Sequence, residues 1–245
     1  MGKLDKVLDV ATPIAKEAAK ETAKLTGKGI KLAGKGIKEA GSKAVANYKE
    51  TKRDQLEEKL SALNEKFSEG IVLCAFDTGS PWDKKKVDKL GIGIYAENAK
   101  VAKLAKILVD DNNELHYKAY GDYENTIKRY FSIHDRYGNK IGSVNEHSKL
   151  FGYPYETVKY KGEKMGNLNH KYIFDNTSYI IERVGTMFSP KHFTVHTIVG
   201  LLMEIEEVRG QEFIAIADKK RMDECALLYM AIDLIWRPKP EQGEA

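Results

Sequence analysis

The C-terminal part of the chain contains a segment that is apolar on every side. Residues 222–236 read MDECALLYMAIDLIW, in which Asp233 is the one charged residue beyond the first turn. An ordinary surface helix would keep one polar face, and this run is shorter than the about 20 apolar residues that cross a bilayer. The pattern therefore predicts a helix over 222–236 that is buried inside a domain.

Short apolar runs separated by turn residues extend from about residue 70 to residue 217. They predict strands at Ile71–Phe76, Gly91–Tyr95, Leu115–Tyr120, Tyr130–Ile133, Ile141–Val144, Thr157–Tyr160, Tyr172–Phe174, Tyr179–Val184, His192–Ile198, Leu202–Val208 and Phe213–Ala217. Residues 99–109 fit a helix or a strand. The turn residues at 135–139 and 208–211 predict β-hairpins. Many short strands at close spacing indicate an antiparallel sandwich or barrel.

The first 68 residues have a helical pattern instead. Apolar residues recur there at steps of three and four. Five glycines between residues 27 and 41, in a short repeat of GKGIKLA and GKGIKEA, weaken a helix by about 1 kcal/mol each relative to alanine. The stretch from Tyr48 to Phe67 has good helix formers and is expected to be the firmer helix.

Two stretches resemble the tubby C-terminal-like superfamily, which includes tubby domains, phospholipid scramblases and LURP-one-related proteins. Residues 131–146, FSIHDRYGNKIGSVNE, are similar to its strand, D-x-x-G-N, strand hairpins, and residues 213–235 are similar to its last strand and helix. The resemblance covers about residues 70–237 in plan. It implies an antiparallel β-barrel around the C-terminal helix, and work at a membrane, since tubby domains bind phosphoinositide headgroups and scramblases act at membranes.

The expected fold class is therefore mainly β with α. We expect a basic helical arm over 1–68, a tubby-like barrel with a central helix at 222–236 over 69–238, and a tail over 239–245. The arm lies outside the resemblance.

The positive charge of the chain is concentrated in the arm. Its net charge is +4, and residues 1–53 hold thirteen Lys or Arg against six Asp or Glu. At steps of three and four residues, one side of a helix would carry Lys16, Lys20, Lys24, Lys28, Lys31, Lys35 and Lys38. Lysines beside a shallow apolar face suit a helix in the headgroup region, where each contributes about 1 kcal/mol. A solvated helix packed on the barrel or on a second copy explains the stripe as well.

Candidate chemistry elsewhere is sparse. Asp77-Thr78-Gly79-Ser80 after an apolar run resembles the loop of aspartic proteases, in which two carboxylates share one proton. The chain has no second Asp-Thr-Gly or Asp-Ser-Gly, and a strand followed by an Asp/Gly turn gives the same pattern. We therefore assign no catalytic residue and expect no enzyme.

Metal and cofactor sites are not expected either. His192 and His196 have the spacing that binds metal on a helix, but a strand is predicted there, in which they would lie about 13 Å apart. Cys74 and Cys225 lie in apolar runs and are expected to be buried thiols, which favours a cytoplasmic setting.

The function expected from these patterns is non-enzymatic, anionic-lipid-binding and peripheral at a membrane, with a regulatory role. The seven arm lysines are the expected lipid-binding residues. The alternative is a scaffold that binds a protein partner, or a second copy of itself, through the N-terminal helix. An aspartic protease at Asp77 is the third interpretation. Nucleic acid is not an expected partner, because aromatic residues for base stacking are absent before Tyr48.

Overall fold

The computed structural model describes residues 33–77, 103–122, 129–147, 154–186 and 189–236, and of residues 33–47 only the course of the backbone. The chain divides into two compact units, Met1–Lys59 and Leu60–Ala245. The boundary falls inside helix α3 (Ala33–Lys66), which includes nearly all of the helix expected over 48–67. The sheet and the C-terminal helix belong to the second unit.

Eleven antiparallel strands form one sheet, in the order β7-β6-β5-β4-β3-β2-β1-β11-β10-β9-β8. Their bounds are Ile71–Asp77 (β1), Lys103–Asp110 (β2), Leu115–Asp122 (β3), Tyr130–Asp135 (β4), Lys140–His147 (β5), Tyr155–Tyr160 (β6), Glu163–Asn169 (β7), Ile180–Arg183 (β8), His192–Thr197 (β9), Gly200–Val208 (β10) and Gln211–Ile216 (β11). The predicted antiparallel sheet is confirmed. Its described part has two edge strands, β7 and β8, so the pairing does not close it into a ring.

Two strand predictions need correction. No strand was expected at β7, whose sequence EKMGNLN lacks alternating β-branched residues. The strand expected at 172–174 is instead a turn, because the Asn169 side chain accepts the backbone N–H groups of Lys171 and Ile173 at 2.9 and 3.1 Å. Only Phe174 bridges back, to Leu168. The ambiguous region 99–109 contains all of β2 except Asp110, and the strand expected at 91–95 lies outside the described residues.

Both predicted hairpins are confirmed, and their turns have a local cause. Between β4 and β5, the Asp135 carboxylate accepts the N–H groups of Tyr137 and Asn139 at 2.9 and 2.8 Å, which folds the chain back. Desolvation alone would raise the pKa of Asp135, but a hydrogen bond from the Asn139 side chain at 2.9 Å, together with these backbone bonds, lowers it. Between β10 and β11, Arg209 and Gly210 both have positive φ, as a two-residue hairpin turn requires.

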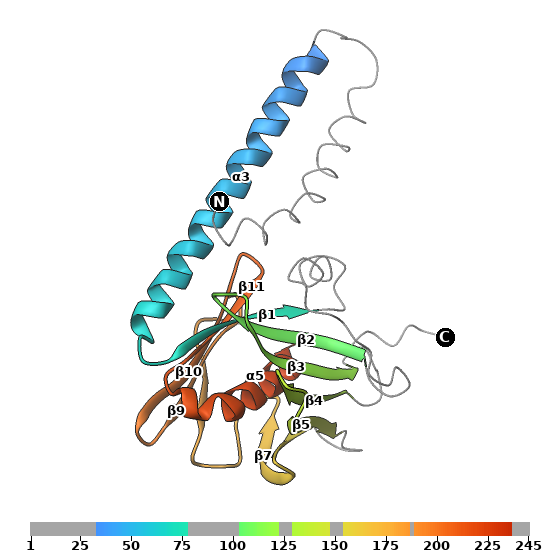
Figure 1. The fold of residues 1–245 in the computed structure, drawn as a ribbon, viewed down its shortest axis with the longest axis vertical. Helices are drawn as coiled ribbons and strands as arrows, with labels where there is room; N and C mark the ends of the chain where they lie inside the picture. Colours follow the sequence, from blue (N-terminus) through green and yellow to red (C-terminus); the bar gives the residue numbers. More distant parts are fainter. Residues whose placement is uncertain (1–32, 78–102, 123–128, 148–153, 187–188, 237–245) are drawn as a thin grey trace, which may run out of the picture. The chain divides into compact units, whose positions relative to one another are not determined.

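Helix α5 (Met222–Trp236) has the predicted bounds and lies within the curve of the sheet (Figure 1). It contacts β4–β7 on one side of the strand order and β10 and β11 on the other. Ten consecutive residues, from Cys225 to Leu234, are buried. A helix with no polar face is therefore enclosed by the protein, as its sequence requires.

Tyrosines hold the first turn of α5 in place. The hydroxyl of Tyr117 donates to Asp223 at 2.9 Å, and that of Tyr179 donates to Glu224 at 2.8 Å. Tyr160 makes a longer bond of 3.4 Å to the other Asp223 oxygen. Carboxylates are favoured at a helix N-terminus by the helix dipole, so these bonds fix the end of α5 against strands β3 and β6.

A buried group of charges, the Asp233 cluster, joins α5 to three parts of the sheet. Asp233 accepts from Lys106 of β2 at 2.7 Å and from Lys191, just before β9, at 2.6 Å. Lys191 also donates to Glu212 of β11 at 3.0 Å, and the hydroxyl of Tyr229 completes the cluster by bonding to Glu212. Two ammonium groups thus face two carboxylates, which keeps the buried charge balanced.

Lys191 and Glu212 are both charged at neutral pH. Burial alone would lower the pKa of Lys191, but the charges of Asp233 and Glu212 outweigh it and raise that pKa. Burial would likewise raise the pKa of Glu212, but Lys106 and Lys191 lower it. The stabilisation from Glu212 is therefore present at neutral pH and is lost as the pH falls through its lowered pKa.

Replacing Asp233 with alanine should destabilise the second unit strongly. Two buried lysines would then share the single carboxylate of Glu212, and breaking a buried pair in this way costs about 3–5 kcal/mol. Urea unfolding followed by tryptophan fluorescence measures the change. Glu163→Ala removes an exposed carboxylate of β7 and should stay within about 0.5 kcal/mol; equal stabilities for the two variants would contradict the structural role of the cluster.

Candidate functional site

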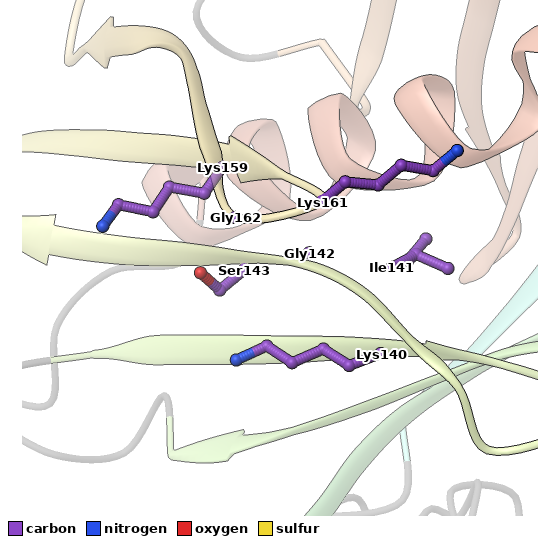
Figure 2. A pocket seen from close by; sticks show the side chains of 7 residues that line it. All are labelled: Lys140, Ile141, Gly142, Ser143, Lys159, Lys161 and Gly162. Carbon is purple, nitrogen blue, oxygen red and sulfur yellow. The ribbon is translucent and has the colours of Figure 1, made fainter.

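Four hairpin turns lie at one end of the sheet. Because neighbouring strands alternate in direction, the β2–β3, β4–β5, β6–β7 and β9–β10 turns share this end with the beginning of β1 and the end of β11. We call it the turn end. An open groove of about 580 Å³ lies here on β5 and β6, and its lining consists of Lys140, Ile141, Gly142, Ser143, Lys159, Lys161 and Gly162 (Figure 2).

The β6–β7 turn shapes the groove. Lys161 and Gly162 have φ of 49° and 90°, so the two strands are joined by a tight two-residue turn of the kind that favours glycine. The backbone N–H of Lys161 donates to the carbonyl of Ile141 on β5 at 2.9 Å. This bond fixes the turn beside the beginning of β5 and brings lysines from separate strands together.

The polar side chains of the groove form two sets. Figure 2 shows the Lys140 and Lys159 side chains extending in the same direction with the Ser143 hydroxyl between them, while Lys161 extends toward α5. Ser143 and Lys159 are cross-strand partners. The Ser143 oxygen accepts from the Asn145 side chain at 3.2 Å, which leaves the hydroxyl hydrogen to be donated.

Lys161 is tied to the helix through Tyr160. A hydrogen bond from Lys161 to the Tyr160 hydroxyl raises the pKa of the ammonium group, with a smaller contribution from the charge of Asp223. The Tyr160 hydroxyl in turn donates to Asp223 at 3.4 Å. Lys161 is therefore a cation at neutral pH. The Lys140 and Lys159 ammonium groups, with the Ser143 hydroxyl between them, can bind an anion such as a phosphate group.

Among the described residues, one group could hold a metal ion: His192 on β9 with Glu204 and Glu206 on β10, whose ligand atoms lie within 4.8 Å of one another. His192 Nε2 lies 3.0 Å from Glu204, and Lys66 forms an ion pair with the other Glu204 oxygen. An ammonium group already balances this carboxylate, so we interpret the group as an ion-pair network. His192 and His196 lie on a strand, as expected.

Most of the lysines predicted to bind lipid lie outside the described residues: Lys16, Lys20, Lys24, Lys28 and Lys31. Lys35 and Lys38 are on helix α3, where the structure describes the backbone alone. Their role, and the role of this helix in binding a protein partner, stay predictions. Two further sets of basic residues differ in exposure. Arg129 is buried in a pair with Glu146 at 3.1 Å, whereas Lys219 and Lys220 are exposed at the turn end.

Asp77 is the last residue of β1 and is buried, and residues 78–80 of the protease-like pattern lie outside the described residues. Cys225 is buried as expected, and burial raises the pKa of its thiol to about 12; Cys74 is only half-buried.

Comparison with known proteins gives no match, whether to a family model, a curated protein or a solved structure. The resemblance to the tubby C-terminal-like superfamily therefore stays a prediction from the sequence. In the part of the chain that the structure describes, no helix has both the length and the apolar character to cross a membrane.

Removing the Tyr160 hydroxyl should lower the pKa of Lys161 toward the ordinary value of a lysine. Tyr160→Phe deletes the hydrogen bond that raises this pKa and keeps the ring, over which the Lys161 ammonium lies at 5.0 Å. Carbon-13 NMR titration of the lysine side chains measures the shift. Tyr155→Phe, at the far end of β6, should leave Lys161 unchanged; an unaltered Lys161 pKa in both variants would refute the link.

Proposed function

We propose that this protein binds anionic phospholipid headgroups at a membrane surface, and that the groove on β5 and β6 is a contact site. The observation that carries the proposal is that Lys140 and Lys159 extend on either side of the Ser143 hydroxyl in one open groove, whose lining also includes Lys161 of the β6–β7 turn. Ammonium groups and a hydroxyl match the oxygen atoms of a phosphate. The groove is shallow and open, which suits a headgroup held at a surface.

The carboxylates of the turn end weaken this attraction only in part. Asp218 and Asp135 accept backbone N–H groups within their own turns and keep their negative charges. Glu114 is paired with Arg136 at 3.8 Å. Asp111 and Glu163 are exposed and reduce the local positive potential. The expected binding is therefore weak and reversible, with about 1 kcal/mol from each lysine near the lipid.

The proposal includes two expectations from the sequence: the tubby-like plan of the fold and the lipid-binding lysines of the N-terminal arm. A sheet curved around a buried C-terminal helix supports the tubby-like plan, and the Leu168–Phe174 bridge beside β7 continues the pairing beyond that edge. The lysines of the arm, where they meet the same membrane, would add to the attraction of the groove.

Removing two groove lysines should weaken vesicle binding about 30-fold. Lys140→Gln with Lys159→Gln removes two charges, which corresponds to about 2 kcal/mol near an anionic surface. Co-sedimentation of the full chain with vesicles of phosphatidylcholine and phosphatidylserine measures the affinity. Added salt should weaken the wild type more than the variant, since the variant has fewer charges to screen.

The matched control is Lys171→Gln with Arg209→Gln, which removes two exposed charges at the opposite end of the sheet. Equal losses in the two double variants would show nonspecific attraction and overturn the groove assignment. Titration with inorganic phosphate, followed by NMR, separates a free-phosphate site from a headgroup site: saturation by phosphate with no vesicle binding would overturn the membrane proposal.

A further inference from the structure

Two adjacent aliphatic side chains are almost fully exposed at the turn end. Ile198 and Val199 form the tip of the β9–β10 hairpin and are 95% and 87% exposed. We call this pair the apolar tip. Single exposed apolar residues are common on protein surfaces, but two neighbouring β-branched residues at the end of a projecting hairpin form a contact surface.

The apolar tip is held by the strands beneath it. Thr197 and Gly200 are cross-strand partners at the base of the turn. The Thr197 hydroxyl contacts the carbonyl of Gly200 and the N–H of Val199, both at 3.4 Å. Gly200 has φ of +126°, which a side chain at this position would oppose. The exposure of the tip is thus a consequence of the hairpin's geometry.

The surroundings of the apolar tip suit a membrane. The N–H of Ala217 bonds to the carbonyl of Leu202 at 2.9 Å, so the chain leaves β11 beside the base of the hairpin and continues into the exposed Lys219 and Lys220. Ile180 lies on the edge strand β8, where it is 55% exposed and pairs with His196 of β9. An apolar point with lysines behind it is the arrangement that lies at the boundary of headgroups and acyl chains.

A protein partner fits this patch less well. A standard interface buries about 800 Å² on each side, and the apolar tip with Ile180 offers three side chains on a narrow hairpin. A bilayer needs no matching surface: it accepts aliphatic side chains at any point where the protein projects into it. The groove lies at the same turn end, where Lys161 of the β6–β7 turn and the exposed Lys219 and Lys220 supply cations for the surface that the apolar tip meets.

We propose that Ile198 and Val199 insert into the apolar boundary layer of the membrane when the groove lysines contact its headgroups. This inference rests on the proposed function and adds a second, apolar component to it. The lysine component falls with salt because charges are screened, whereas the component from the apolar tip persists at high salt.

The first test replaces the apolar tip. Ile198→Ser with Val199→Ser should weaken binding to phosphatidylserine vesicles about 10- to 100-fold, since each aliphatic side chain loses part of its transfer free energy. The loss should remain at high salt. Ile173→Ser with Val184→Ser, which changes two exposed aliphatic residues at the opposite end of the sheet, is the matched control and should bind as the wild type does.

The second test reads insertion directly. Val199→Trp should be quenched by phospholipids brominated on their acyl chains, above the background that Trp82 and Trp236 give in the wild type. The insertion is overturned if vesicle binding depends on the lysines, the tryptophan is not quenched and the serine variant binds as the wild type does. That result leaves the proposed function standing, and it is also the result expected if the apolar tip binds a protein. Absence of vesicle binding by the wild type overturns both proposals.

Discussion

The carboxylate of Asp233 is held in the interior of the second unit between two lysines, and the orientation of helix α5 against the sheet depends on that requirement. Helix α5 is apolar on all sides, so apolar contact alone could be satisfied in many rotations about its axis. A single buried charge on the helix removes that freedom, because it must meet Lys106 from β2 and Lys191 from the segment before β9 at 2.7 and 2.6 Å. An unmatched charge in this position would cost several kcal/mol.

Helix α5 also affects the packing of strands β5 and β6, which carry the groove lysines. Gly142 of β5 lies so close to α5 that a Cβ there would come within 2.8 Å of the Leu227 side chain and 2.2 Å of the Lys159 carbonyl. Strands β5 and β6 are therefore close to each other and to the helix, and the exposed lysines on them come together on the outside. The Tyr160 hydroxyl connects the two layers, since it bonds to Asp223 of α5 and to Lys161 of the groove.

Elements formed within one segment of the chain, such as a helix or a hairpin, could be predicted from the sequence. Sites formed by several segments could not. The bounds of α5 and the hairpin at 135–139 follow from local apolar content and turn residues. Strand β7 was missed because it lacks apolar alternation, and the turn at Asn169 resembled a strand because Tyr172 and Ile173 are β-formers. The groove depends on the register that pairs Ser143 with Lys159, which no local pattern reveals. Ile198 of the apolar tip was predicted to end a strand, because β-branched residues favour strands. The position of the tip on the surface follows from its exposure in the structure, which the sequence pattern does not reveal.

Hydrogen–deuterium exchange of the full chain, with and without phosphatidylserine vesicles, tests most directly the claim that the turn end faces a membrane. The structure predicts slower exchange on binding at the β4–β5, β6–β7 and β9–β10 turns, with the β10–β11 turn at the opposite end unchanged. Bound protein that shows protection only outside the turn end would contradict the account.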